Sequence, residues 1–148
     1  KMSDFSFNNE ETIQVGLSWD FFEGTTKVDL DCSALIFDDC GVLVDACFYN
    51  RLEACSGALV HSGDNRDGLS DGVDERITLN LSKFPANISF VVFAVNAFQG
   101  GTLKDVETAN AVFLNGRGQT LTSISATCSA SANEENTCIL LCLLQASS

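Results

Sequence analysis

Two groups of acidic residues have the types and spacing that cation binding requires. Asp29 and Asp31 lie two residues apart in a strand-like stretch, so their carboxylates point to the same face. Two like charges this close repel each other, and Asp is disfavoured in strands, so the pair lowers stability unless a cation neutralises it. The second group comes from one loop and contains five acids within twelve residues: Asp64, Asp67, Asp71, Asp74 and Glu75.

The composition of this loop indicates calcium. Gly63, Gly68 and Gly72 permit the tight curvature that lets carboxylates and backbone carbonyls converge. Calcium takes about six to eight oxygen ligands from flexible loops of this kind. The loop contains no Cys and only His61 lies nearby, so softer metals find few of their preferred ligands. A solvated acidic loop that only keeps the protein soluble is the alternative that stays open.

An EF-hand is a specific rival, because residues 64–75 have its length, with Asp first and Glu last. However, position three of the loop is Arg66, and glycine occupies position five rather than position six. Neither flank has a helical pattern, and an alternating apolar run follows Glu75 directly. The EF-hand is therefore rejected, and the cation cage must be built between strands of a sheet.

The elements that must position these acids are strands. Apolar residues alternate along 13–19, 28–37 and 77–81, and residues 88–98 form an almost continuous apolar run, as in a strand buried on both faces. No segment carries a convincing helical stripe. Eight or nine short strands separated by turn signals predict an all-β fold, a two-sheet antiparallel β-sandwich. We expect one domain over residues 13–148, preceded by an N-terminal extension, residues 1–12.

The charge and hydropathy of the chain exclude several classes of protein. The 148 residues include 20 acids and 8 bases, and the formal net charge of −12 repels nucleic acid. The longest apolar run, residues 138–144, is too short to cross a membrane, which takes about 20 residues. Cations and basic proteins are the partners that this composition allows.

The seven cysteines and the single histidine have no catalytic pattern. No C-x-x-C pair occurs, and most cysteines have apolar neighbours, so we expect buried free thiols and a reducing intracellular compartment, the cytoplasm or an organelle. His61 has no recognisable nucleophile motif beside it, so a structural hydrogen bond is expected. We expect no enzymatic activity.

Five motifs in order closely resemble the tellurium-resistance TerD family. They are VGLSWD (15–20), VDLDCSA (28–34), FYN (48–50), HSGDN (61–65) and DGVDE (71–75). The family pattern is approximately VGLGWD, FDLDASA, FYN, HxGDN and GDGDDE. The resemblance implies a β-sandwich that binds one or two calcium ions, is linked to stress responses and is not known as an enzyme.

The resemblance also implies a set of metal ligands. The expected ligands are Asp29, Asp31, Asp64, Asp71, Asp74 and Glu75, and the second choices are Asp20, Asn65 and Asp67. Val73 stands where the family usually has a further Asp, which could weaken or remove one of two calcium sites. The predicted function is a calcium-binding, stress-related binding or scaffold module. The alternative is a structural subunit of a larger assembly with a degenerate metal site.

The C-terminal part departs from the family pattern. Resembling domains continue past a strand that matches residues 141–145 into a further Trp-bearing strand, whereas this sequence ends at Ser148. The comparison with the family pattern therefore leaves open a sandwich that lacks its last strand. Its apolar C-terminal edge is a candidate site for a protein partner that completes the sheet.

Overall fold

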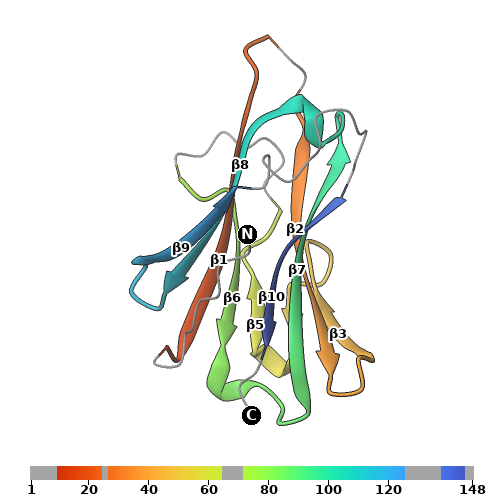
Figure 1. The fold of residues 1–148 in the computed structure, drawn as a ribbon, viewed down its shortest axis with the longest axis vertical. Helices are drawn as coiled ribbons and strands as arrows, with labels where there is room; N and C mark the ends of the chain where they lie inside the picture. The colour runs from red at the N-terminus through yellow and green to blue at the C-terminus, as the bar shows by residue number, and fades with distance from the viewer. Residues whose placement is uncertain (1–9, 25–26, 65–71, 126–137, 146–148) are drawn as a thin grey trace.

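The strands form two antiparallel sheets in a computed structural model that describes residues 10–24, 27–64, 72–125 and the backbone of 138–145 (Figure 1). This arrangement confirms the predicted all-β sandwich. Within these described ranges there is no α-helix, and the helical elements are three short 3-10 segments, Cys55–Gly57, Leu81–Lys83 and Leu103–Asp105. No helix in the described part of the chain is long and apolar enough to cross a membrane.

The six-stranded sheet has the order β4-β5-β6-β1-β8-β9. Its strands are β1 (Thr12–Phe21), β4 (Glu53–Ala54), β5 (Leu59–His61), β6 (Glu75–Asn80), β8 (Val106–Asn115) and β9 (Thr120–Ser125). The alternation in β1 buries Val15, Leu17 and Trp19 against the other sheet. Gln14, Ser18 and Asp20 alternate with these residues and face outward, as in a sheet with one solvated face.

The four-stranded sheet has the order β10-β7-β2-β3. Its strands are β2 (Asp29–Asp38), β3 (Leu43–Cys47), β7 (Ile88–Gln99) and β10 (Cys138–Gln145). The inward residues of β7, including Phe93, join the core, and the ring of Phe93 meets that of Phe113 from the other sheet at 6.5 Å. The outward residues of β7 differ from the prediction. Val92 and Ala94 are half-buried and Phe98 is exposed, so the described chain covers only one face of this strand.

Gly16 of β1 allows the side chain of Val73 to approach the strand closely on the outer face of the six-stranded sheet. A Cβ atom at this position would lie 2.7 Å from Cγ1 and 2.8 Å from Cγ2 of Val73. The backbone N–H of the next residue, Asp74, donates to the carbonyl of Leu17 at 2.8 Å, so the end of the acidic loop pairs with β1. Glycine is therefore required here by packing.

We expect Gly16→Ala to lower the free energy of unfolding by about 1–3 kcal/mol, because the added methyl group collides with Val73. Urea denaturation measures this loss. The second substitution Val73→Ala should restore part of it, whereas Ser18→Ala, at the next outward position of β1, should cost little. If the losses caused by Gly16→Ala and Val73→Ala simply added in the double variant, the collision with Val73 would not explain why position 16 requires glycine.

Candidate metal centre

Three carboxylates meet at the start of β2, two from β2 itself and one from a residue distant in sequence. One oxygen each from Asp29, Asp31 and Asp64 lies within 4.8 Å of the others. Asp29 is 8% and Asp31 is 4% exposed, whereas Asp64, which follows β5, is exposed to solvent. The structure therefore brings together the same-face pair and the first acid of the loop, as the sequence predicted for a cation cage.

The start of β2 is free to accept this loop because β3 stops short of it. β3 pairs with β2 only between Ala34 and Phe37. Beyond Ala34, side chains from the other sheet replace the missing strand. The N–H of Cys32 donates to Oε2 of Glu75 at 2.8 Å, and Nε2 of His61 lies 3.2 Å from the carbonyl of Cys32. These contacts hold the edge of β2 against β5 and β6.

His61 also fixes the path of the chain toward Asp64. Its ring is buried, and Nδ1 accepts the N–H of Gly63 at 3.0 Å. Because Nδ1 is an acceptor, the proton of the neutral ring resides on Nε2, which donates to Cys32. The predicted structural hydrogen bond of His61 is thus confirmed, and it places Asp64 one residue beyond an anchored turn.

The environment of Asp31 opposes its negative charge. Burial is the main reason that the pKa of Asp31 rises from 3.8 to about 7, and the neighbouring carboxylates of Glu75, Asp29 and Asp64 raise it further. His61 acts in the opposite direction but more weakly. Three hard oxygen donors in an electronegative site suit a calcium ion in chemistry and charge. The described residues thus supply three of the about six to eight oxygen ligands that calcium takes.

We expect the stability of the metal-free protein to fall as the pH rises from 3.8 to about 7. In this range the folded protein binds more protons than the unfolded chain, because the pKa of Asp31 is raised by folding. Chemical denaturation in chelator across this range measures the effect. Asp31→Asn should flatten the profile, and Asp39→Asn, at an exposed turn, should leave it unchanged. Parallel profiles for wild type and Asp31→Asn would contradict the raised pKa.

The other predicted ligands have different positions. Glu75 is fully buried and faces Cys32 and His61, whose Nε2 lies 3.6 Å from Oε2 of Glu75. Asp74 accepts the N–H of Trp19 at 3.1 Å. Asp20 is exposed on the outer face of the six-stranded sheet and accepts from Thr108 at 3.1 Å. The structure brings none of these three into the group of oxygens formed by Asp29, Asp31 and Asp64, and Asn65, Asp67 and Asp71 lie outside the described residues.

The alternation of the sequence after the acidic loop indicates the inward position of Glu75. Glu75 begins the alternation that continues with Ile77 and Leu79, and all three face the core. A carboxylate in phase with core residues indicates an internal hydrogen-bond partner, because burial without one is costly. Here that partner is the backbone of β2.

Val73 does not point toward the carboxylate cluster. Its side chain covers Gly16 on the outer face of the six-stranded sheet, whereas Asp29 and Asp31 belong to the other sheet. The missing carboxylate at this position therefore removes no side-chain ligand from the cluster.

We expect Glu75→Ala to lower the free energy of unfolding in chelator by about 1–3 kcal/mol, because the N–H of Cys32 loses this acceptor. Urea denaturation provides the measurement. Glu75→Gln keeps an acceptor oxygen and should lose less, and Glu53→Ala, at an exposed position of β4, serves as the control. If Glu75→Ala were as stable as wild type without metal, the residue would have no structural role.

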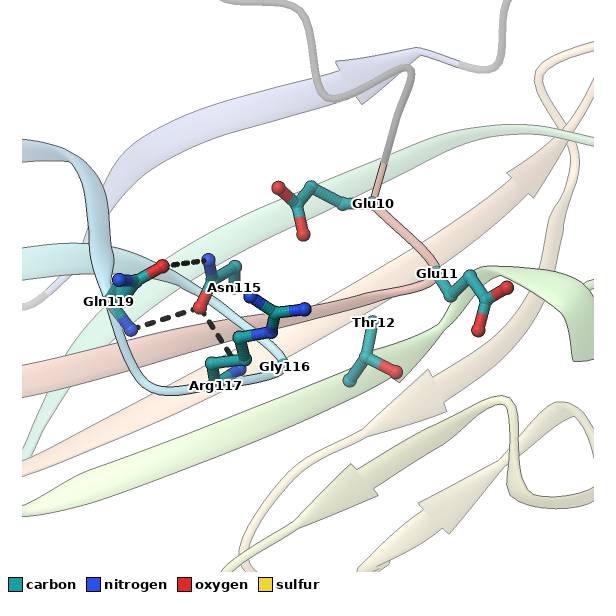
Figure 2. A pocket seen from close by; sticks show the side chains of 7 residues that line it. All are labelled: Glu10, Glu11, Thr12, Asn115, Gly116, Arg117 and Gln119. Atoms are coloured by element: carbon teal, nitrogen blue, oxygen red, sulfur yellow. Dashed lines mark hydrogen bonds between the residues drawn. The ribbon is translucent and has the colours of Figure 1, made fainter.

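Two other features of the surface are distinct from this cluster. Oxygen and sulfur atoms of Asp38, Asp39 and Cys40 also lie close together, in a turn that Oδ1 of Asp38 organises by accepting the N–H groups of Cys40 and Val42. An open cavity of about 510 Å³ lies beside the start of β1 (Figure 2). Its lining includes Glu10 and Arg117 and none of the predicted site residues.

The sequence matches the TerD domain family over residues 3–146, nearly the whole chain. The chain belongs to the TerD domain family. Its motifs now have positions in the fold. The segment at 15–20 lies in β1, the Asp29–Asp31 motif opens β2, and the segment at 61–64 leaves β5 beside it.

Relatives of this TerD domain include proteins named for resistance and stress. It is 40% identical over 107 residues to tellurium resistance protein TerZ of Serratia marcescens, a match that covers 66% of this chain and 55% of the relative. It is 39% identical over 106 residues to general stress protein 16U of Bacillus subtilis, with coverage of 68% and 52%. The domain thus spans about half the length of the curated relatives it matches.

Solved structures share the fold of this TerD domain. A protein of unknown function, SAV2460, superposes with a TM-score of 0.76 at 18% identity, covering 95% of this chain and 83% of that one. A homologue of the telluride resistance protein TerD, SCO6318 from Streptomyces coelicolor, gives 0.64 at 22% identity, covering 78% and 72%.

Proposed function

We propose that this TerD domain binds calcium through the carboxylates at the start of β2 and acts as a stress-related binding or scaffold module. The observation that carries the proposal is the cluster of Asp29, Asp31 and Asp64, in which oxygens lie within 4.8 Å of one another. The raised pKa of Asp31 gives the energetic reason, because burial, and after it the neighbouring carboxylates, disfavours the negative charge of Asp31.

In this proposal the buried and exposed acids have different roles. Asp29 and Asp31 are fixed by β2 and form the rigid side of the site, and Asp64 closes it from the loop. Bound calcium would neutralise these carboxylates, and its binding free energy would add to the stability of the fold. His61 and Glu75 act through the backbone, since they hold the edge of β2 and the turn before Asp64.

The cellular role is inferred from the relatives and the thiols. Relatives are named for tellurium resistance and general stress, and we assign a role in such a response to this domain, without enzymatic activity. Of the four cysteines that the structure describes, Cys32 and Cys47 are buried free thiols as expected, whereas Cys40 is exposed and Cys55 is half-buried. Burial raises the pKa of Cys47 to about 11, so its reactive thiolate is scarce at neutral pH. These thiols support a reducing intracellular compartment.

We expect calcium to raise the free energy of unfolding by about 2.7 kcal/mol at a hundredfold excess over its dissociation constant. Isothermal calorimetry and thermal unfolding with calcium or chelator measure this effect. Asp31→Asn should abolish the heat of binding and the calcium-induced shift, yet raise the melting temperature in chelator, because it removes a repelled charge.

Asp39→Asn provides the matched control, because it removes an exposed carboxylate outside the cluster and should leave the calcium response intact. A calcium response that persists in Asp31→Asn would place the ion elsewhere. The absence of any binding heat in the wild type would exclude the calcium proposal.

A structural subunit with a degenerate metal site is the second candidate. It is favoured by β10, which is the edge strand of the four-stranded sheet and pairs on one side with β7. An edge strand of this kind can accept a strand from another chain, so we retain the C-terminal edge as a candidate partner site. This candidate predicts no calcium heat and a complex that forms without calcium.

A further inference from the structure

The outward face of the four-stranded sheet is apolar in its part next to the β2–β3 hairpin, whereas Asp31, Ser33 and Asn96 lie toward its other end. Two rows of side chains cross it, because Phe37 of β2 is opposite Leu43 and Phe90, and Leu35 is opposite Val92. We call these five residues the outer apolar face. Leu43 is 53% exposed and the other four are half-buried, so solvent reaches the whole face in the described part of the chain.

The other sheet of the same sandwich provides the comparison. The outward positions of β1 and β6 are mainly polar: Gln14, Ser18, Asp20, Arg76, Thr78 and Asn80. That is the usual composition of a solvated sheet face. The outer apolar face has instead the composition of a buried one, and contiguous apolar surface of this kind marks an interaction site.

The charge of the molecule indicates the kind of partner. Two copies of a chain with a net charge of −12 repel each other, so a second copy is a poor cover for this face. Carboxylates lie at both ends of the outward side of β2, with Asp29 and Asp31 at its start and Asp38 and Asp39 at the hairpin. A partner with apolar side chains flanked by Lys or Arg complements both features.

The edge beside this face is protected against strand addition. The pairing of β3 with β2 has a register shift between Ile36 and Phe37. The carboxylate of Asp45 accepts the N–H groups of Ala46 and Cys55, and it forms an ion pair with Arg51 at 2.8 Å. A bulge and a charged side chain at an edge disfavour pairing with another strand. On the β3 side a partner therefore packs on the face and adds no strand, as helices cover sheets in layered domains.

We propose that the outer apolar face docks an amphipathic helix of another protein, with an apolar stripe flanked by basic residues. Leu35, Leu43 and Phe90 contact the stripe, and the acidic β2–β3 hairpin receives the basic flank. This docking is independent of calcium binding at the carboxylate cluster.

The test uses a labelled synthetic peptide of about 18 residues, made of Leu and Lys with helical amphipathic spacing. Fluorescence anisotropy measures its affinity for the whole chain, in calcium and in chelator. Leu35→Ser or Phe90→Ser should weaken binding about tenfold or more, and Asp39→Asn should weaken it at low salt. Leu43→Ser, at the most exposed position, keeps the test valid if a more buried variant fails to fold.

Val112→Ser is the matched control, because Val112 is a half-buried apolar residue on the outward face of the other sheet. It should bind the peptide like wild type. Three results would overturn the proposal: equal binding of a scrambled peptide of the same composition, equal weakening by Val112→Ser, or no binding at all. If sedimentation showed a dimer that Leu43→Ser converts to a monomer, the face would belong to a second copy of the chain, and the proposal would be overturned.

Discussion

The hydrogen bonds at the start of β2 connect the two sheets at the point where the carboxylates gather. Glu75 of β6 accepts the N–H of Cys32, and His61 of β5 lies against the carbonyl of the same residue. Side chains from one sheet thereby satisfy backbone groups of the other, where β3 no longer pairs with β2. If β3 continued along this edge of β2, it would occupy the space beside Asp29 and Asp31 that the loop carrying Asp64 now takes.

This arrangement has an electrostatic consequence. Glu75, which accepts the N–H of Cys32 in β2, is a buried carboxylate. The carboxylates of Asp29, Asp31 and Asp64 gather at the same end of β2, where Asp29 and Asp31 are buried and Asp64 is exposed. Burial is the main reason for the raised pKa of Asp31, and this concentration of negative charge raises it further. The charged form of Asp31 is therefore disfavoured in the metal-free protein, and the calcium ion that we propose would offset this cost.

The two sheets also differ in how they meet their surroundings. On the outer side of the six-stranded sheet, Val73 packs over Gly16 and the outward residues of β1 and β6 are mainly polar. On the four-stranded sheet, the described chain leaves the apolar outer side accessible to solvent. The near-continuous apolar sequence of β7 suits a strand covered on both faces, but within the described residues only its inward face is covered, by the six-stranded sheet. The difference between the two sheets separates the proposed cation site at the start of β2 from the proposed docking surface near the β2–β3 hairpin.

The sequence by itself determined the strands, the same-face position of Asp29 and Asp31, and the family, because alternation fixes side-chain direction within a strand and the motifs follow in order. It did not determine which acids of the loop would join them. Only the packing of the two sheets decided that Asp64 reaches the pair, that Glu75 turns inward to Cys32, and that Val73 covers Gly16. These contacts join residues of different strands, and their distances depend on where β3 ends and how the sheets stack, which no local pattern encodes.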